Sequence, residues 1–517
     1  MFNEIVAIGL IGFFVYLWVF RRFYYLIWKL NGLYGLLSQP VLTVFVWSMF
    51  DPRYVIDRLK SLRENYRFKG PLGVVIGPRG VLYLDDPVSI EKVLNSPQCI
   101  DKTFIQDGFF TRKGLLHAKG QKWKNRRKQL NPTFNLANLV SFFPIFNTIG
   151  NSLADKFDVL AKGNKDVDSD HDNQINYKTI EDFINRAVLV AACRTTMGTT
   201  TNFLDTDDEG IVEAYKVLFK ISSVKSYKPW LQLKPIFKMS KLYKIDVKYN
   251  ELIDMFVKKI VNEKNEIWKE NRENNKSRED DDFEGTTVPP VTRRNFIEHI
   301  FHLAENGELT MQDIEDESSS MILAASETVS NSLSLLLLCL ASHPDCQHKL
   351  QQEIDETLNG AEITIGDIQN MKYLDMVMNE GLRLMPTIPM LLRNVSDDFY
   401  LQKDVVVPKD TFIIIDTFHI HRDRKLWGPH AEDFYPEHFL PENAASRNPF
   451  IFLPFCRGLR FCIGWRYSLF LAKVFLVKIL RNYHIETNVR LKDLKFISGI
   501  SLKVKDKKNV HFTVSKR

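Results

Sequence analysis

Ten residues near the end of the sequence decide how the rest is interpreted: Phe455-Cys456-Arg457-Gly458-Leu459-Arg460-Phe461-Cys462-Ile463-Gly464. Glycines on both sides of Cys462 allow the backbone to fold tightly around its sulfur. The apolar residues 465–480 predict a helix directly after this loop. The N–H groups and the positive end of such a helix stabilise a thiolate, and Arg460 supplies a cation for an anionic group on a bound cofactor.

Cys462 is the candidate metal ligand of this loop. A thiolate whose sulfur accepts hydrogen bonds is the fifth ligand that a haem iron needs for O–O cleavage. The segment fits F-x-x-G-x-R-x-C-x-G at all five fixed positions and resembles the haem-binding loop of the cytochrome P450 superfamily. The resemblance implies haem b, held non-covalently apart from the thiolate–iron bond of Cys462, with Phe455 and Arg460 among its binding residues. Cys456 stands where the family usually has a small residue such as Ser, and the alternative role for Cys462 is a buried structural cysteine.

Three further cofactor-binding residues follow from the same resemblance. Trp123 and Arg127 are four residues apart and share one helix face, and the resemblance makes them partners of the haem propionates. Arg393 stands where the family often has another propionate-binding arginine. The neighbouring basic residues are interpreted either as a solubilising surface or as part of a docking face for an acidic flavoprotein reductase: Lys122, Lys124, Arg126 and Lys128.

Glu380 and Arg383 match the E-x-x-R pair of the family. Glutamate and arginine one helical turn apart can form a salt bridge that, in this family, braces the core beside the haem loop. A third member, usually an arginine, is His438 in this chain, so we expect the bracing to be altered there rather than absent. The role of this pair is structural, and buried ion pairs can favour specificity more than stability.

The candidate oxygen side lies in the segment from Ala324 to Val329. The family pattern places an acid and an alcohol next to the oxygen site, here Glu327 and Thr328. The resemblance implies that this pair widens the local helical hydrogen bonding, admits water and delivers protons to dioxygen. Ala325 replaces the usual glycine and Val329 replaces the usual second hydroxyl, so the width of the groove and the proton supply are both in question.

The composition indicates a large folded protein. Of the 517 residues, 45% are hydrophobic and 26% charged, and the net charge of +6 is spread thinly. Disordered, collagen-like, coiled-coil, repeat and disulfide-scaffold classes are excluded, and a nucleic-acid binder would concentrate its basic charge far more. The six cysteines form no C-x-x-C pair, which argues against a structural zinc site.

The hydrophobic patterns predict a mainly α fold with small β-sheets. The capping-box pattern at Thr310–Asp313 begins a helix of more than thirty residues, roughly 45 Å long, that ends near Ser342 before Pro344 and must cross the body of the protein. Further helices are expected over residues 140–157, 180–196, 249–261 and 346–358. Short strands are expected over residues 73–76, 81–84, 405–407 and 412–415.

Residues 1–30 are predicted to form an N-terminal membrane anchor. Sixteen uncharged residues, Ile5 to Phe20, precede Arg21 and Arg22 and span roughly 24 Å as a helix. The basic flank places residues 31–517, the catalytic domain, on the cytosolic face of the endoplasmic reticulum membrane, which is the microsomal location. Residues 32–50 are interpreted as the entry to that domain. Residues 263–294 are expected to form a charged, exposed loop within it.

Several segments resemble the microsomal family-4 clan, particularly its insect members. They are Gly114-Leu115-Leu116, Glu308-Leu309-Thr310 and the H-P-D-C-Q stretch after the long helix. Some members of that clan carry a glutamate, at the position of Ala324, that esterifies the haem. Since this chain has alanine there, covalent haem attachment is not expected, and the inference to strict terminal hydroxylation of fatty acids is weaker.

The resulting hypothesis is a haem-thiolate monooxygenase that inserts one oxygen atom into an apolar substrate. Fatty acid, hydrocarbon, lipid hormone and xenobiotic substrates all stay open. The chain carries no NADPH or flavin motif, so electrons are expected from NADPH through cytochrome P450 reductase, with cytochrome b5 as a second candidate donor. Two alternatives remain: a haem-thiolate isomerase or dehydratase that needs no reductase, and a degenerate haem-binding scaffold without catalysis.

Overall fold

The structure is a computed structural model that describes residues 71–76, 79–103, 106, 113–163, 175–207, 209–279, 295–358, 362–402 and 405–517, together with scattered residues between 10 and 25. Most of the predicted anchor and the boundary at residue 30 lie outside the described residues and stay predictions. Within the anchor, Phe13, Phe14 and Trp18 are helical and exposed to solvent.

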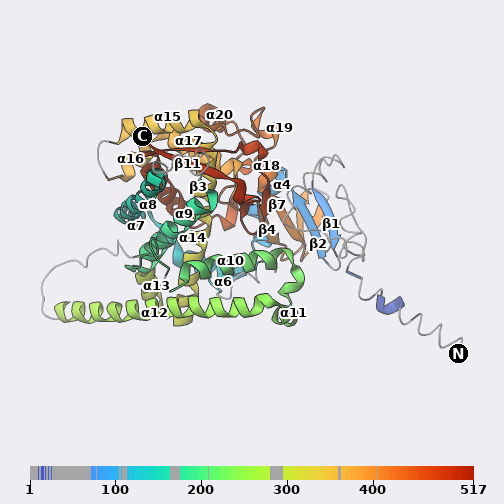
Figure 1. Cartoon of the computed structure of the whole chain (residues 1–517). Coiled ribbons are helices and arrows are strands. Elements are labelled where there is room, and N and C mark those ends of the chain that lie inside the picture. Colours follow the sequence, from blue (N-terminus) through green and yellow to red (C-terminus); the bar gives the residue numbers. More distant parts are fainter. Residues whose placement is uncertain are drawn as a thin grey trace.

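The prediction of a mainly α fold with small sheets is confirmed (Figure 1). In chain order the helices are α4 (Pro87–Asn95), α6 (Gly120–Leu130), α7 (Leu136–Ser141), α8 (Phe143–Gly163), α9 (Tyr177–Met197), α10 (Ile211–Tyr227), α11 (Lys234–Met239), α12 (Lys241–Glu279), α13 (Phe296–Glu305), α14 (Met311–Ala341), α15 (Pro344–Thr357), α16 (Ile365–Asn370), α17 (Lys372–Leu384), α18 (Thr417–Ile420), α19 (Arg424–Trp427), α20 (Pro441–Ala445) and α21 (Trp465–Leu480). The strands are β1 (Leu72–Ile76), β2 (Arg79–Leu84), β3 (Ile175–Asn176), β4 (Met390–Asn394), β5 (Phe399–Gln402), β6 (Val405–Val407), β7 (Phe412–Asp416), β8 (Tyr483–Thr487), β9 (Phe496–Ser498), β10 (Leu502–Val504) and β11 (His511–Lys516).

The long helix α14 begins and ends where the sequence predicts. The Thr310 side chain accepts from the N–H of Asp313, the Asp313 side chain accepts from the N–H of Thr310, and Ser342 caps the other end. Among the described residues, α14 has the length and hydropathy of a membrane span, but 78% of that stretch is buried inside the protein. It is therefore the central core helix.

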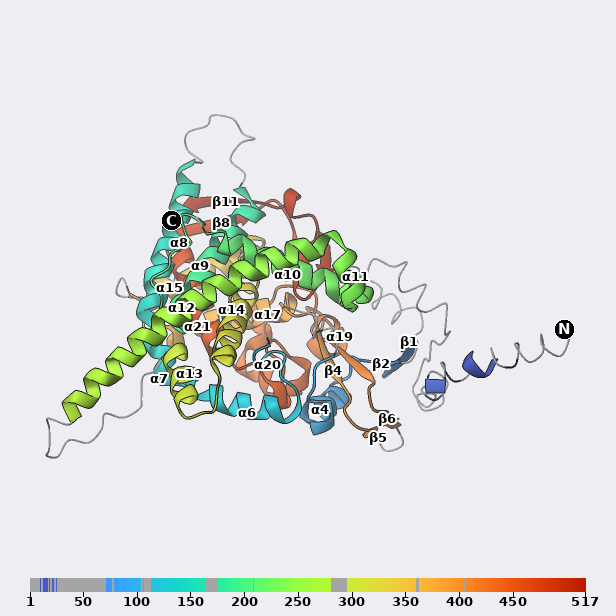
Figure 2. The ribbon, with the colours of Figure 1, turned by 90° about the horizontal axis from the view of Figure 1, so that it is seen from below.

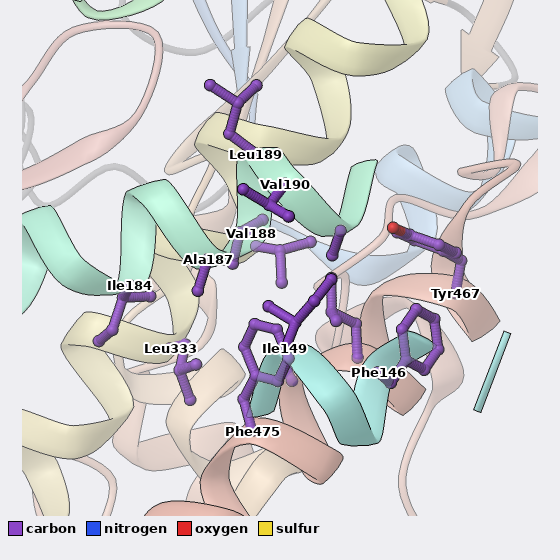
Figure 3. Packing of buried hydrophobic residues seen from close by; sticks show 14 of the residues in the cluster. Phe146, Ile149, Ile184, Ala187, Val188, Leu189, Val190, Leu333, Tyr467 and Phe475 are labelled. Carbon is purple, nitrogen blue, oxygen red and sulfur yellow. The ribbon is translucent and has the colours of Figure 1, made fainter. Parts of the chain in front are cut away.

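The main core lies where α8, α9, α14 and α21 pack together (Figure 3). Phe146 of α8, Val188 of α9, Leu333 of α14 and Phe475 of α21 are completely buried there. Burying one such side chain stabilises the fold by about 1.5–3 kcal/mol. This core fixes α14 against α21, the helix that follows the cysteine loop.

A four-stranded sheet lies to one side of the helical body, with strand order β1-β2-β7-β4 (Figures 1 and 2). β2 and β7 run parallel, and the other two pairings are antiparallel. Its buried side chains form a second core with α4. The described residues form three further sheets: the β9–β10 pair, the β5–β6 pair and the three-stranded sheet β3-β11-β8.

The segment 263–294, predicted to start helical and to continue as a charged, exposed loop, is helical further than expected, because α12 continues to Glu279. Contacts with α13 support this extension: the Trp268 indole N–H donates to Glu305 at 2.7 Å, and Arg272 forms an ion pair with the same carboxylate. An i,i+3 pair between Lys269 and Glu266 adds to it. The charged composition indicated exposure correctly, but it did not exclude a solvent-exposed helix. Residues 280–294 lie outside the described part of the chain.

Candidate functional site

The cysteine loop is held by its own backbone. A short 3-10 turn, Gly458–Arg460, precedes Cys462, and the N–H of Cys462 donates to the carbonyl of Phe455 at 3.0 Å. Gly458 has φ +70°, and a Cβ there would lie 2.2 Å from the carbonyl oxygen of Leu94 in α4, so only glycine fits. Gly464 has φ −91° and no such contact. Of the two glycines noted in the sequence, the structure therefore requires Gly458.

Burial raises the pKa of the Cys462 thiol, although the N–H of Gly464 and the Arg127 guanidinium act in the opposite direction. The hydrogen bond from the loop backbone favours the thiolate, as the sequence predicts, but desolvation is the larger effect on the pKa of Cys462. A metal cation at the sulfur removes the thiol proton outright. The loop thus fits a metal ligand better than a free nucleophilic thiolate.

Arg460 is fixed beside the loop by three contacts. Its Nε donates to the carbonyl of Ile100 at 2.9 Å, its Nη2 donates to the carbonyl of Ala118 at 2.8 Å, and its guanidinium lies 4.4 Å from the Trp123 ring centroid. Burial, followed by repulsion from Arg393, lowers the pKa of Arg460 to about 9. The structure therefore brings together Arg460 and Trp123, two of the predicted cofactor-binding residues.

Positive charge accumulates around the two thiols of the loop. Lys102, which the sequence analysis missed, joins this group: burial and the nearby Arg460 and Arg393 lower its pKa to about 7. Burial also lowers the pKa of Arg127, although the neighbouring Cys462 opposes this. Burial is the main cause of these lowered pKa values, and repulsion from Arg393 adds to it for Lys102 and Arg460. An anionic group on a cofactor fits beside these partly buried cations.

The guanidinium of Arg393, in β4, lies against the thiol of Cys456. Its Nη2 donates to the Cys456 sulfur at 3.0 Å, and its Nη1 donates to the carbonyl of Leu392 at 2.9 Å. The Cys456 thiol in turn donates to the carbonyl of Arg457 at 3.3 Å, and Cys456 has φ +63°. This second cysteine therefore positions a cation.

Helix α6 places Trp123 in the interior and leaves Arg127 half-buried. Arg126, which the sequence analysis grouped with the surface lysines, is instead buried and forms ion pairs with Asp313 at 2.7 Å and Glu317 at 3.2 Å, both on α14. It therefore joins α6 to α14 and does not belong to a docking face. The exposed basic residues of this helix are Lys122, Lys124 and Lys128.

The predicted oxygen-side pair separates into two environments. The Thr328 hydroxyl is half-buried and donates to the carbonyl of Ala324 at 2.7 Å. Glu327 is buried, and its Oε1 accepts from Ser501 at 3.1 Å and forms an ion pair with Lys503 at 2.7 Å. Helix α14 is an unbroken α-helix here, so the expected widening of its hydrogen bonding is not observed.

Glu380 and Arg383 of α17 form a completely buried bidentate ion pair with two N–O distances of 2.7 Å. The His438 Nδ1 lies 3.2 Å from Glu380 Oε1, in the bracing role that the sequence analysis assigned to an altered third member. Burial alone would raise the pKa of Glu380, but the hydrogen bonds from Arg383 and His438 lower it below its usual value. The brace therefore keeps its charge.

His421 is a structural residue that the sequence analysis missed. Its Nε2 accepts from the N–H of Leu453 at 2.9 Å, so its Nδ1 carries the proton and donates to the carbonyl of Arg383 at 3.0 Å. Burial, and then the Arg383 charge, lower its pKa to about 3. The neutral imidazole joins the Glu380–Arg383 brace to the segment that enters the cysteine loop.

A comparison with known families decides what this assembly is. The sequence model of the family described as Cytochrome P450 matches residues 38–510, which is nearly the whole chain. The chain belongs to the cytochrome P450 family. Membership implies a haem iron with a thiolate ligand and identifies this P450 as a monooxygenase, an oxidoreductase that uses O2 and a substrate together with redox partners.

Individual relatives of this P450 come from insects, as the sequence resemblance indicated. It is 40% identical to "Probable cytochrome P450 318a1" of Drosophila melanogaster, over 96% of this chain and 95% of the relative. It is 31% identical to "Probable cytochrome P450 313b1" of the same species, over 98% of both chains. A family-4 member, "Cytochrome P450 4c21" of Blattella germanica, is 32% identical over 85% of both chains.

Proposed function

We propose that this P450 inserts one atom of O2 into an apolar substrate such as a fatty acid, a lipid hormone or a xenobiotic, with electrons that NADPH delivers through a reductase. The reaction is RH + O2 + NADPH + H+ → ROH + H2O + NADP+. The observation that carries the proposal is the cysteine loop, in which the backbone fixes Cys462 and two carbonyl groups fix Arg460 beside it.

The residues around the loop fit haem b. When haem is bound, Cys462 would ligate its iron, Trp123, Arg127, Arg393 and Arg460 would bind its propionates, and Phe455 would belong to its binding loop. Lys102 adds to the positive charge that a dianion neutralises. Haem supplies, when bound, the iron that activates O2. The protein orients it through the backbone-fixed loop and through Arg460, which is held by two carbonyl groups.

The proton supply is assigned to α14. Thr328 presents a hydroxyl on the half-buried face of the helix, one residue from the Glu327 carboxylate. Such an alcohol and acid transfer protons through water at a site where the substrate excludes bulk solvent. These two residues are the proposed catalytic side chains.

The proposed electron supply depends on helix α6, and the proposed location depends on the N-terminal segment. The exposed lysines of α6, namely Lys122, Lys124 and Lys128, form a basic face for the acidic reductase, with cytochrome b5 as a second donor. Residues 5–20 anchor the chain in the endoplasmic reticulum membrane, and the basic pair Arg21-Arg22 keeps the catalytic domain on the cytosolic side.

The deciding experiment is the absorption spectrum of the reduced, carbon-monoxide-bound protein, compared with a Cys462→Ser variant. We expect the wild type to give the red-shifted Soret band of thiolate-ligated iron and the variant to lose it. Cys456→Ser is the matched control and keeps the band, because the hydroxyl preserves the contact with Arg393. A haem-loaded wild type without the band contradicts the proposal. A band with substrate turnover that needs no NADPH instead supports the isomerase alternative.

A further inference from the structure

Four charged side chains form a chain that ends at Glu327. The Lys503 Nζ of β10 lies 2.7 Å from Glu327 Oε1 and 3.6 Å from Glu181 Oε1 of α9. The Lys507 Nζ lies 2.5 Å from the same Glu181 oxygen. The exposed fraction of these side chains runs from 10% for Glu327 to 27% for Lys507. The result is a neutral set of two carboxylates and two ammonium groups, mostly shielded from solvent.

The ammonium group of Lys503 stays charged in this place. Burial by itself would lower its pKa, but the charges of Glu327 and Glu181 outweigh burial, and the pKa lies above its usual value. A buried ion pair stabilises little by itself, and the loss of one partner leaves the other charge uncompensated. Removal of Lys503 therefore acts on Glu327 directly.

The backbone next to Lys503 is held by hydrogen bonds on both sides. The carbonyl of Leu502 accepts from the Asn331 side chain of α14 at 3.0 Å, and the N–H of Leu502 donates to the carbonyl of Thr387 at 2.9 Å. Ser501, the residue before β10, donates to the same Glu327 oxygen that Lys503 contacts. The side chains of Ser501 and Lys503, two residues apart at the start of β10, thus fix the orientation of the carboxylate.

Glu327 also borders a small pocket between α9, α10 and α14. The polar part of the pocket wall comes from Asn185 and Lys216 together with Ser326, which precedes Glu327. Leu189, Val212, Tyr215 and Leu323 supply the apolar part of the wall. The Glu327 carboxyl group therefore has one oxygen fixed by Ser501 and Lys503 and borders a pocket of mixed polarity.

We propose that Lys503 is the positioning residue of the oxygen-side acid: together with Ser501 it fixes the orientation of the Glu327 carboxyl group at the pocket wall, so that this group relays protons toward Thr328. This inference rests on the proposed function, because it takes Glu327 as the proton donor. Glu181 and Lys507 support the position of the Lys503 ammonium group and do not contact the acid themselves.

The first test compares Lys503→Met and Lys503→Arg in the haem-loaded enzyme with its reductase, with Lys508→Met as the control at an exposed lysine of the same segment. We expect Lys503→Met to keep the carbon-monoxide band and to oxidise NADPH, but to form about tenfold less product per NADPH and release hydrogen peroxide instead (O2 + NADPH + H+ → H2O2 + NADP+). The solvent isotope effect on product formation should rise, Lys503→Arg should restore most of the product yield, and Lys508→Met should behave like the wild type.

The second test does not depend on turnover. Urea unfolding of the haem-loaded wild type, Glu327→Gln, Lys503→Met and the double variant forms a double-mutant cycle. We expect the double variant to unfold at a higher urea concentration than the sum of the two single effects predicts, because each single variant leaves one buried group without its partner.

The outcomes separate this inference from the proposed function. If the wild type lacks the carbon-monoxide band or forms no oxygenated product, the proposed function fails. If the wild type does both, and Lys503→Met keeps the wild-type product yield and isotope effect, only the inference is overturned. The inference is overturned as well if Lys503→Arg performs as poorly as Lys503→Met, since the charge is then not what matters.

Discussion

The cysteine loop and the central part of α14 both take part in the proposed reaction, but different interactions determine their structures. Backbone groups determine the loop: a hydrogen bond across it, a glycine that no other residue can replace, and carbonyl groups that fix Arg460. On α14 the backbone is an ordinary α-helix: the Thr328 hydroxyl bonds to a carbonyl of that helix, and the side chain of Lys503 holds Glu327. Substitutions in the loop should therefore damage the structure, whereas substitutions on α14 should change the chemistry.

Gly458→Ala should give the largest effect. The new Cβ meets the Leu94 backbone at 2.2 Å, and alanine at φ +70° is strained. We expect about 3 kcal/mol or more of lost stability, together with poor haem incorporation, measured by urea unfolding and by the haem-to-protein ratio. Gly464→Ala is the matched control, because its Cβ has no contact closer than 3.9 Å and φ is −91°. Equal effects of the two variants would contradict the assignment of strain to Gly458.

His421→Asn tests the brace behind the loop through its pH dependence. The unfolded chain protonates this histidine near pH 6.5, and the folded protein only near pH 3. The unfolded state therefore binds more protons between these values, and stability falls as the pH is lowered from 6.5 toward 3. From about pH 7.5 to about pH 5.5 this residue should account for a loss of about 1.4 kcal/mol.

Asparagine can replace the Nδ1 donor of His421 to the Arg383 carbonyl and does not titrate, so His421→Asn should lose some stability at every pH but flatten the pH dependence of urea unfolding by that amount. His430→Asn is the control, because His430 is exposed and makes its one described ion pair with the exposed Asp433. If His421→Asn keeps the full wild-type slope, the histidine is not buried in its neutral form.

Thr328→Val should give the smallest effect on the structure. Among the described residues, its hydroxyl bonds to a carbonyl of its own helix, and valine has the same shape as threonine. We therefore expect the free energy of unfolding to change by less than about 1 kcal/mol. The carbon-monoxide band should be unchanged, while the product formed per NADPH falls. Thr328→Ser keeps the hydroxyl and should keep the yield. A Thr328→Val variant that loses haem would remove the contrast between loop and helix.

Local patterns were sufficient for several elements. The capping box at Thr310 and the breaker at Pro344 fixed the ends of α14, and α21 covers the predicted residues 465–480. The length of the helix after residue 262 was underestimated, because the contacts of Trp268 and Arg272 with Glu305 depend on the packing of α12 against α13. The helix propensity of a segment does not include contacts with a neighbouring helix.

The sequence by itself determined the family, the candidate cysteine ligand and the main helices, because each depends on residues close together in the chain: a ten-residue loop, an i,i+3 pair, a cap and a breaker. Only the tertiary structure decided which groups surround those residues. The Lys503 ammonium lies at Glu327 although the two are far apart in sequence, Arg126 faces inward, and His421 joins the brace to the loop. Such long-range partners are chosen by the packing of the core, since a buried charge or imidazole must find its counterpart wherever the fold places one.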